Sequence, residues 1–388
     1  MDRRSFLQAG ATVLSGAFLG GSARYVAQAT AAIGDSPYGP LATRANPDGL
    51  RLPAGFTSRL LAVSGQRVAG TTYTWHTSPD GGACTARPDG GWVYISNGER
   101  SNAAGGVGVI AFDPAGSVVD AYSILSGTTR NCSGGMTPWG TYLSGEEHAG
   151  GGVYECDPLR PGEGMHRPQL GTFQHEMIAV DPFDGTVYMV EDNEAGRLYR
   201  FTPTRFGDLS SGRLAAANVT RGCVTWQTAS TTAPDRSATT TAFSGAEGAW
   251  IMRGSLYLTT KLDVRVWRLD LAGQQLSVLY DHAAQPGASL DAVDNLVGHE
   301  PSGDLFVAED GGNLEIGVVA TVGPAMVGAF AQFVGHDKSE VTGLAFNPDR
   351  SRLYVTSQRG TDGVTGRTYE IRGPFRTRPR ARIPSRRR

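Results

Sequence analysis

The sequence lacks long apolar runs. It contains no stretch of 18 or more apolar residues, and a helix that crosses a bilayer needs about 20. We therefore expect no membrane-spanning segment in the mature chain. Two short motifs are also missing, G-x-G-x-x-G between a strand and a helix, and G-x-S-x-G. Their absence argues against a nucleotide-binding domain and against a Ser-His-Asp hydrolase.

Cysteine is scarce, with only Cys84, Cys132, Cys156 and Cys223. Four cysteines allow three disulfide pairings, and spacing alone does not choose among them. If Cys132 binds a metal ion, one of the other three is left unpaired. Under that condition the disulfide we expect is Cys156–Cys223.

Charged residues make up only 19% of the chain, while glycine is abundant, with 53 residues. This composition predicts a globular, turn-rich protein without long helices. The formal net charge is -2, but it becomes -11 for residues 32–375, once the start and the arginine-rich end are left out. An acidic body argues against nucleic acid as a partner and favours cations or metal-bridged anions. Residues 376–388 are expected to form a disordered basic tail, which either contacts an anionic envelope surface or has no role.

The first 31 residues have the pattern of an export signal. Arg3 and Arg4 precede Ser5-Phe6-Leu7, a mild apolar stretch follows, and an A-x-A site lies near residue 30. This order is typical of a twin-arginine leader, which carries folded proteins, often with a metal already loaded. We expect a periplasmic, cell-envelope or extracellular protein that meets the twin-arginine export machinery. The alternative is a basic start to an ordinary helix.

Residues 32–375 repeat one pattern. Six units each hold a β-rich run and a Gly-bearing turn. They are centred on "GGWVYISNGE", "TPWGTYLSGEE", "GTVYMVEDNEAGRLYRF", "GSLYLTTKLDVRVWRLD", "GDLFVAEDGGNLEIGVV" and "SRLYVTSQRGTDGVTGRTYEI". Short strands recurring at periods of about 40 to 60 residues predict an all-β, six-bladed β-propeller in a single domain. Residues 205–242 are expected to be an insertion or long loop, and a β-sandwich is the alternative fold.

Acidic residues recur at two places in these units. Glu176 precedes Glu191 by fifteen residues, Asn295 precedes Glu309 by fourteen, and Cys132 precedes Glu146 by fourteen. Equivalent positions of successive blades form a ring around a propeller channel, so these side chains are expected to line one metal-binding mouth. The candidate ligands are Cys132, Glu146, Glu147, Glu176, Glu191, Glu247, Asp294, Asn295, Glu309, Asp310, Glu340, Asn97 and Glu99.

The kinds of ligand indicate more than one kind of metal. Many oxygen ligands suit Ca²⁺, whereas a thiolate suits a softer or transition metal such as iron or zinc. Carboxylates at this density would otherwise repel one another and take up protons. The alternatives are solvated turn residues and, for Cys132, a buried apolar thiol.

Several long segments resemble the PhoX-type alkaline phosphatase family. They are "GTTRNCSGGMTPWGTYLSGEE", "FQHEMIAVDPFDGTVYMVEDNEAGRLYRF", "DNLVGHEPSGDLFVAED" and "SEVTGLAFNPDRSRLYVTSQ". The resemblance implies a six-bladed propeller that hydrolyses phosphate monoesters with an iron and calcium cluster, Fe³⁺ and Ca²⁺. It also implies that Cys132 is an iron ligand. Glu247 is present in "GAEGAW", but the arginine of the family's Arg-Pro-Glu phrase has no counterpart there.

The resemblance directs the choice of catalytic residues and substrate. We expect a small phosphoester substrate, with Arg130 gripping the phosphate or forming a structural ion pair. His175 is expected to act as an acid toward the leaving group or to orient Glu176. The protein is expected to be a monomer. The alternatives are a non-catalytic calcium-binding propeller and a calcium-only hydrolase such as a lactonase, neither of which needs the Cys132 thiolate.

Overall fold

The computed structural model describes residues 32–33, 36–285, 287–322 and 326–377. The expected leader and residues 378–388 of the expected tail lie outside these ranges. Within them the chain is all-β, and its only helical segments are two 3-10 turns, Pro168–Leu170 and His282–Ala284. No helix in this part of the chain is long and apolar enough to cross a membrane.

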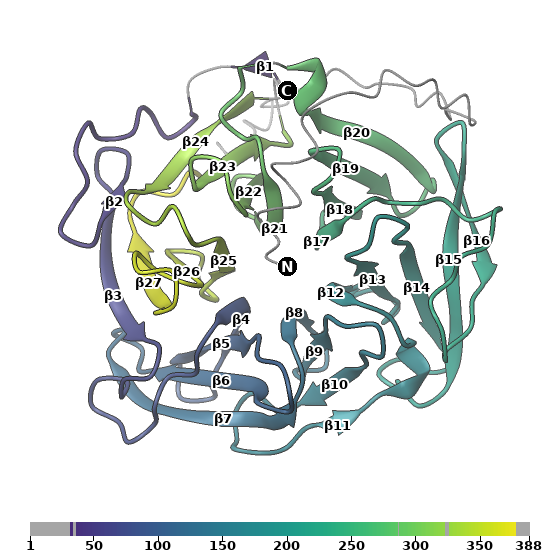
Figure 1. Ribbon diagram of the computed structural model, residues 1–388, viewed down its shortest axis with the longest axis horizontal. Helices are drawn as coiled ribbons and strands as arrows, with labels where there is room; N and C mark the ends of the chain where they lie inside the picture. The colour runs from purple at the N-terminus through teal and green to yellow at the C-terminus, as the bar shows by residue number, and fades with distance from the viewer. Residues whose placement is uncertain (1–31, 34–35, 286, 323–325, 378–388) are drawn as a thin grey trace, which may run out of the picture.

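The strands form antiparallel meanders arranged around a central axis (Figure 1). Six inner strands contact one another in a closed ring. They are β4 (Pro79–Ala86), β8 (Asn131–Met136), β12 (His175–Val180), β17 (Ala246–Met252), β21 (Val293–His299) and β25 (Val341–Phe346). The propeller-like fold expected from the repeats is therefore confirmed.

Each inner strand pairs with the next strand along the chain, and these second strands are β5 (Trp92–Gly98), β9 (Tyr142–Glu146), β13 (Val187–Glu191), β18 (Ser255–Thr260), β22 (Asp304–Glu309) and β26 (Arg352–Ser357). The third strands are β6 (Gly105–Phe112), β10 (Val153–Cys156), β14 (Leu198–Pro203), β19 (Arg265–Asp270), β23 (Glu315–Ala320) and β27 (Arg367–Arg372). The outer strands are β7 (Val118–Thr128), β11 (Met165–His166), β15 (Gly212–Thr220), β20 (Gln275–Asp281), β24 (Met326–Phe333) and β3 (Thr57–Val63). The short strands β1 (Ala32–Ile33) and β2 (Leu50–Arg51) pair with β24.

The described strands make five sheets, because two meanders are joined into one. Strand β16 (Cys223–Thr228) pairs with β15 along its length and meets β20 through Cys223 and Gln275, giving a nine-stranded sheet. Of the two alternatives for residues 205–242, an insertion or a long loop, the long loop is thus wrong where β15 and β16 lie. Their hairpin turns at Arg221 and Gly222, both with positive φ, as two-residue hairpin turns require.

The two ends of the chain close the ring. Strand β3, from the beginning, completes the sheet of β25, β26 and β27 from the end. The hydroxyl of Tyr38 donates to the buried Asp304 carboxylate at 2.9 Å, and Arg376 pairs with the same carboxylate at 2.6 Å. Arg376, assigned from sequence to the tail, therefore contacts the folded body.

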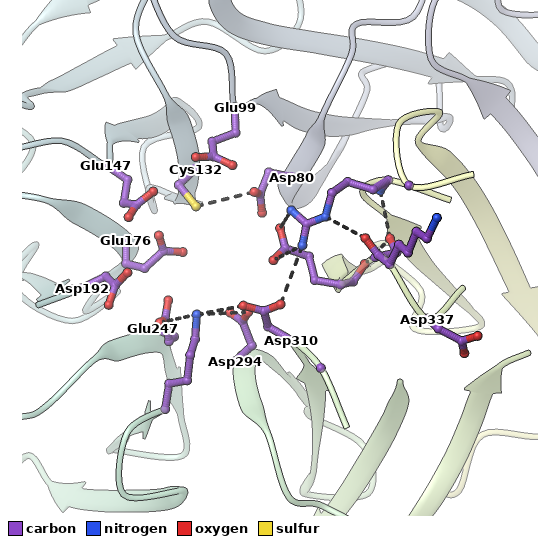
Figure 2. A pocket seen from close by; sticks show the side chains of 17 residues that line it. Asp80, Glu99, Cys132, Glu147, Glu176, Asp192, Glu247, Asp294, Asp310 and Asp337 are labelled. Atoms are coloured by element: carbon purple, nitrogen blue, oxygen red, sulfur yellow. Dashed lines mark hydrogen bonds and ion pairs between the residues drawn. The ribbon is translucent and has the colours of Figure 1, made fainter. Parts of the chain in front are cut away.

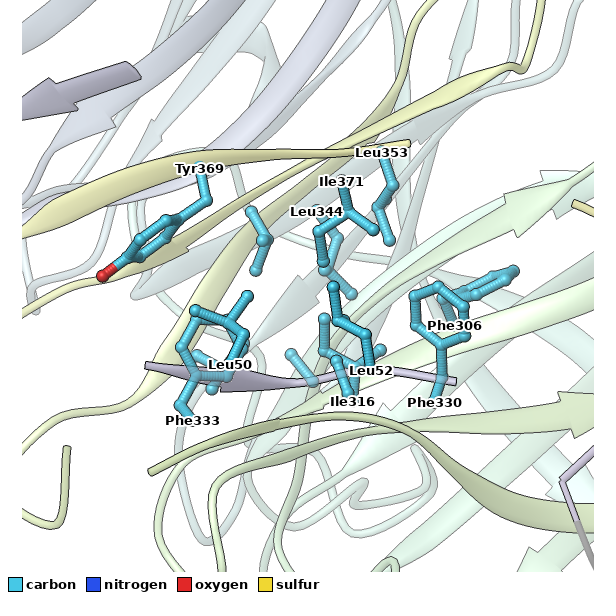
Figure 3. Packing of buried hydrophobic residues seen from close by; sticks show 14 of the residues in the cluster. Leu50, Leu52, Phe306, Ile316, Phe330, Phe333, Leu344, Leu353, Tyr369 and Ile371 are labelled. Atoms are coloured by element: carbon cyan, nitrogen blue, oxygen red, sulfur yellow. The ribbon is translucent and has the colours of Figure 1, made fainter. Parts of the chain in front are cut away.

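A hydrophobic cluster between the last two meanders shows how neighbouring sheets are held together. Figure 3 shows Leu50 and Leu52, from the N-terminal segment, between Phe306 and Phe330 on one side and Ile371 on the other. All five side chains are buried. Burial of aromatic and aliphatic surface of this extent is the main stabilising contribution in such a core.

The cysteines are not paired in this fold. All four thiols are free, so the expected Cys156–Cys223 disulfide is not formed. Cys156 is buried in β10, whereas Cys223 is exposed in β16.

Candidate metal centre

A cavity of about 520 Å³ lies on the central axis, at the ends where the inner strands begin. Figure 2 shows its acidic side chains, apart from Asp337, gathered around one space from several strands. The charged and thiol side chains that line it are Asp80, Glu99, Cys132, Glu147, Glu176, Asp192, Glu247, Lys261, Asp294, Asp310, Asp337, Lys338, Glu340 and Arg359.

The first ring of these side chains comes from a bulge that recurs in every inner strand. Pairing with the second strand is interrupted between residues three apart, namely Pro79/Gly82, Asn131/Gly134, His175/Ile178, Ala246/Ala249, Val293/Leu296 and Thr342/Ala345. A bulge re-aims the side chain it carries. The first bulged residues are Asp80, Cys132, Glu176, Glu247, Asp294 and, in the sixth strand, Gly343.

The second ring comes from the residue that directly follows each second strand. Those residues are Glu99, Glu147, Asp192, Lys261, Asp310 and Gln358. All except Gln358 line the cavity. Two kinds of strand end, repeated around the ring, thus place carboxylates, one thiol and one ammonium group on the same axis.

Three of the predicted ligands, Glu146, Glu191 and Glu309, lie one residue earlier and do not line the cavity. Each is the last residue of its strand and accepts a hydrogen bond from the backbone N–H six residues further on. Because side chains alternate along a strand, only the next residue can face the axis. These glutamates fix the loop whose neighbouring residue reaches the cavity.

Two predicted asparagine ligands have protein partners instead. Asn97 donates to the Tyr142 hydroxyl at 3.0 Å and accepts from the Ser144 hydroxyl at 3.0 Å. Asn295 donates to the Asp294 carboxylate at 2.9 Å, while Asp294 itself lines the cavity. Glu340 enters the cavity from just before β25 and not from the bulged position.

Glu176 is the side chain whose environment most strongly requires a cation. It is 1% exposed, and neither of its carboxylate oxygens has a hydrogen-bond partner among the described residues. Burial, followed by the charges of Glu247 and Glu147, raises the pKa of this carboxyl well above its usual value. A buried carboxylate without partners is costly, so a bound cation would stabilise its ionised form.

The ligand atoms around Glu176 are close enough to share metal ions. Four groups of three residues each have ligand atoms within 4.8 Å of one another. They are Cys132, Glu147 and Glu176; Glu176, Glu247 and Asp294; Asp294, Asp310 and Glu340; and Asp80, Glu99 and Glu340. The groups share members, so the donor set fits a cluster of several ions.

The group that contains Cys132 differs chemically from the others. The Cys132 Sγ lies 3.5 Å from an Asp80 carboxylate oxygen, and burial together with the charge of Asp80 raises the pKa of the thiol well above its usual value. The thiolate therefore needs a cation beside it to form at neutral pH. A sulfur donor beside carboxylates suits a transition metal, whereas the oxygen-only groups suit calcium.

Two of the three cationic side chains that line the cavity form ion pairs with its carboxylates. The Lys261 ammonium lies 2.8 Å from Glu247, 3.1 Å from Asp310 and 3.9 Å from Asp294. The Arg359 guanidinium lies 3.0 Å from Glu340 and 3.7 Å from Asp310. The cavity thus has an anionic wall around Cys132 and Glu176 and a wall of mixed charge around Lys261 and Arg359.

The two candidate catalytic residues lie outside the cavity lining. Arg130 pairs with Glu99 at 3.1 Å and with Glu147, so its guanidinium holds two cavity carboxylates in place. His175 is fully buried, its ring packs on Phe173, and its Nε2 lies 3.2 Å from the Gly171 carbonyl oxygen. Burial lowers the pKa of His175 to about 3.

Sequence reasoning missed Asp80 and Asp192 as candidate ligands, and gave no role to Lys261 and Arg359. Asp192 follows Glu191 as Glu147 follows Glu146, and in both pairs the second acidic residue lines the cavity. The recurring acidic pairs could therefore have indicated Asp192. Asp80 precedes Glu99 by nineteen residues, whereas the recurring pairs of positions in the other units were recognised by a separation of fourteen or fifteen residues.

Comparison with known proteins places this arrangement in context. Residues 104–155 and 149–246 match the family model of the alkaline phosphatase PhoX. The resemblance to the PhoX family is confirmed. The PhoX match contains Cys132, Glu147 and Glu176, whereas Glu247 and the later candidate ligands follow its end. No curated protein matches this chain.

Solved structures share the PhoX-like fold. Pseudomonas fluorescens PhoX, in complex with vanadate as a transition state analogue, aligns with a TM-score of 0.67 at 17% identity, over 86% of this chain and 97% of that one. The gluconolactonase XC5397 from Xanthomonas campestris aligns with a TM-score of 0.51 at 12% identity, over 87% of this chain and 99% of that one. At these identities the likeness establishes the fold alone.

The stability of the metal-free protein should increase as the pH falls. Burial raises the pKa of Asp80 to about 7 and of Asp294 to about 6. The folded state therefore binds these protons more tightly than the unfolded state, so lowering the pH from about 9 to about 6.5 should raise Tm. Thermal melts in chelator measure this, and saturating calcium should remove the dependence. A flat Tm in chelator would contradict it.

Replacing Lys261 should make the stability of the protein more dependent on bound metal. In Lys261→Met the carboxylates of Glu247 and Asp310 lose their ammonium partner, so we expect a lower Tm in chelator and a larger increase on adding calcium. Lys338→Met is the matched control, because Lys338 lines the same cavity without a side-chain ion pair among the described residues. Equal calcium responses in the two variants would contradict the prediction.

Proposed function

We propose that this protein is an exported phosphatase that hydrolyses phosphate esters with a cluster of iron and calcium ions. The observation that carries the proposal is the buried Glu176 carboxylate, which has no hydrogen-bond partner in the described part of the chain and belongs to both the Cys132 group and an oxygen-only group. The PhoX match over the segment that contains Cys132, Glu147 and Glu176 supports the reaction class.

The proposed ligands fall into two groups that differ in their donor atoms. In this proposal Cys132, Glu147 and Glu176 hold iron, because a thiolate prefers a transition metal. Glu247, Asp294, Asp310 and Glu340 hold calcium through oxygen atoms alone. When bound, such ions would polarise the phosphoryl oxygens and neutralise the charge that develops in the transition state.

The chain's own groups would position the substrate and the ligands. Arg359 is 35% exposed at the cavity and pairs with carboxylates there, so it is our candidate for contacting a phosphoryl oxygen. Arg130 takes the role of a positioning residue, because its guanidinium already pairs with Glu99 and Glu147. We assign His175 no role as an acid or a nucleophile, because its side chain is buried and does not line the cavity.

The finer architecture and location belong to the same proposal. The nine-stranded sheet contains two complete meanders, β12–β15 and β17–β20, and counting each as a blade gives a six-bladed propeller. The arginine pair near the start supports export by the twin-arginine route to the periplasm, envelope or medium. We propose a monomer that acts on a small phosphoester.

Hydrolysis of p-nitrophenyl phosphate by protein exported with its own leader tests the activity. We expect turnover that is lost in chelator and reduced about 100-fold or more in Glu176→Gln, since that change removes the negative charge of a ligand that two groups share. Glu155→Gln is the control, a buried glutamate that pairs with Arg167 outside the cavity. A metal-loaded wild-type protein with no phosphatase activity would overturn the proposal and favour a calcium-binding propeller or another hydrolase.

Elemental analysis tests the role of the thiol. We expect iron and calcium in the wild-type protein and calcium alone in Cys132→Ser, because a serine hydroxyl does not replace a thiolate as an iron ligand. Cys84→Ser changes a cysteine outside this cavity and should keep both metals. Iron retained in full by Cys132→Ser, or no iron in the wild type, would refute the iron-thiolate site.

A further inference from the structure

A second cavity, of about 270 Å³, lies at the other end of the inner strands. The metal cavity takes side chains from the beginnings of these strands, whereas the second cavity takes them from later positions. Its lining includes Cys84 in β4, Met136 in β8, Met177 in β12 and Phe346 in β25. The two cavities therefore lie toward opposite ends of the central ring, and none of the lining residues is shared.

The walls of this second cavity are mostly apolar. Met136, Met177, Trp250, Ile251 and Phe346 contribute large apolar side chains. Phe183, which follows the lining residue Pro182, is 93% exposed and is the most exposed large hydrophobic side chain in the described part of the protein. Apolar walls favour a ligand with an apolar body.

One basic side chain, Arg350, lines the cavity without a hydrogen-bond or ion-pair partner for its guanidinium among the described residues. Its backbone is held in the turn between β25 and β26, where its N–H donates to Asn347 and its carbonyl oxygen lies 3.2 Å from His299 Nε2. Its guanidinium makes no hydrogen bond or ion pair with any described residue. Burial lowers the pKa of Arg350. A half-buried guanidinium beside apolar walls is stabilised when an anion pairs with it, most strongly through two parallel hydrogen bonds.

Glu300 limits the charge of that anion. It is the only acidic residue in the described part of the lining, and it interacts electrostatically with Arg350 and Arg253 without lying within ion-pair distance of either. Burial raises the pKa of its carboxyl. The attraction to one guanidinium grows in proportion to the charge of the ligand, whereas the cost of removing the ligand from water grows with the square of that charge. With Glu300 opposing any anion, a monoanion is therefore favoured over a dianion such as a phosphate monoester. The charges favour a carboxylate.

We propose that this cavity binds a small amphipathic carboxylate, whose anionic head pairs with Arg350 and whose short hydrocarbon body contacts Met136, Met177 and Phe346. The volume of about 270 Å³ is slightly below the range of about 300 to 1,000 Å³ for small-molecule sites, so the body has only a handful of carbons. This site is separate from the proposed phosphatase centre and does not depend on it.

The site is tested by calorimetry. The mature, metal-loaded protein is titrated separately with hexanoate and with 1-hexanol. Hexanoate should bind more tightly than hexanol. In Arg350→Met, whose side chain keeps the apolar bulk, hexanoate affinity should fall about tenfold or more, while hexanol affinity stays the same. Arg359→Met is the matched control, since Arg359 lines the metal cavity, and it should leave hexanoate binding unchanged.

A second variant should change hexanoate affinity in the opposite direction, and it tests the proposal even if Arg350→Met does not fold. Glu300→Gln removes the negative charge, so it should strengthen hexanoate binding and admit hexyl phosphate to the same cavity. The proposal is overturned if hexanoate binds no more tightly than hexanol. It is also overturned if Arg359→Met abolishes hexanoate binding, because the carboxylate would then be bound at the metal centre.

Discussion

Repulsion among buried carboxylates is the constraint on which this structure depends. Six strands converge on one axis, and both the first bulged residue and the loop after the second strand deliver charged side chains to it. Glu176, Glu247 and Asp294 have oxygen atoms within 4.8 Å of one another in a buried site. Such a group is stable only with cations between the oxygens or with protons on them. Lys261 supplies one cation, and metal ions would supply the rest.

The propeller-like ring can hold this charge because its loops are fixed by their own hydrogen bonds. Glu146, Glu191 and Glu309 each accept a backbone N–H six residues further on, which sets the direction of the next side chain. Arg130 holds Glu99 and Glu147 from outside the cavity. Ligands positioned in this way lose little conformational freedom when a cation binds, and that preorganisation favours both metal affinity and catalysis.

The recurring pattern of the sequence was enough to predict an all-β propeller and a single acidic mouth that includes Cys132, Glu147 and Glu176. Strand register was not available from it. Whether Glu191 or Asp192 faces the axis, and whether Asp294 or Asn295 does, depends on how side chains alternate along the strand. Only the hydrogen-bonded pairing of neighbouring strands fixes that alternation. Asp80 was missed because its loop to Glu99 is longer than the others. The pairing of β16 with β20, which joins two meanders, is a single contact between distant segments and has no local signal.

The opposite ends of the ring have contrasting chemistry. One end gathers carboxylates, a thiol and three cationic side chains, and the other gathers apolar side chains around Arg350. The same strands supply both, since a bulge at the beginning of each strand changes which side chains face the axis further along. The fold therefore offers two separate sites whose ligands differ in charge and polarity.

The central claim is that bound cations, and not protons, stabilise the buried carboxylates. Anomalous diffraction from crystals of the exported protein, with data at the iron absorption edge, tests this most directly. The account predicts an iron peak in contact with Cys132 Sγ and a Glu176 oxygen, with further ions among Glu247, Asp294, Asp310 and Glu340. An ordered cavity that contains only water, with Glu176 hydrogen-bonded as a neutral acid, would contradict it.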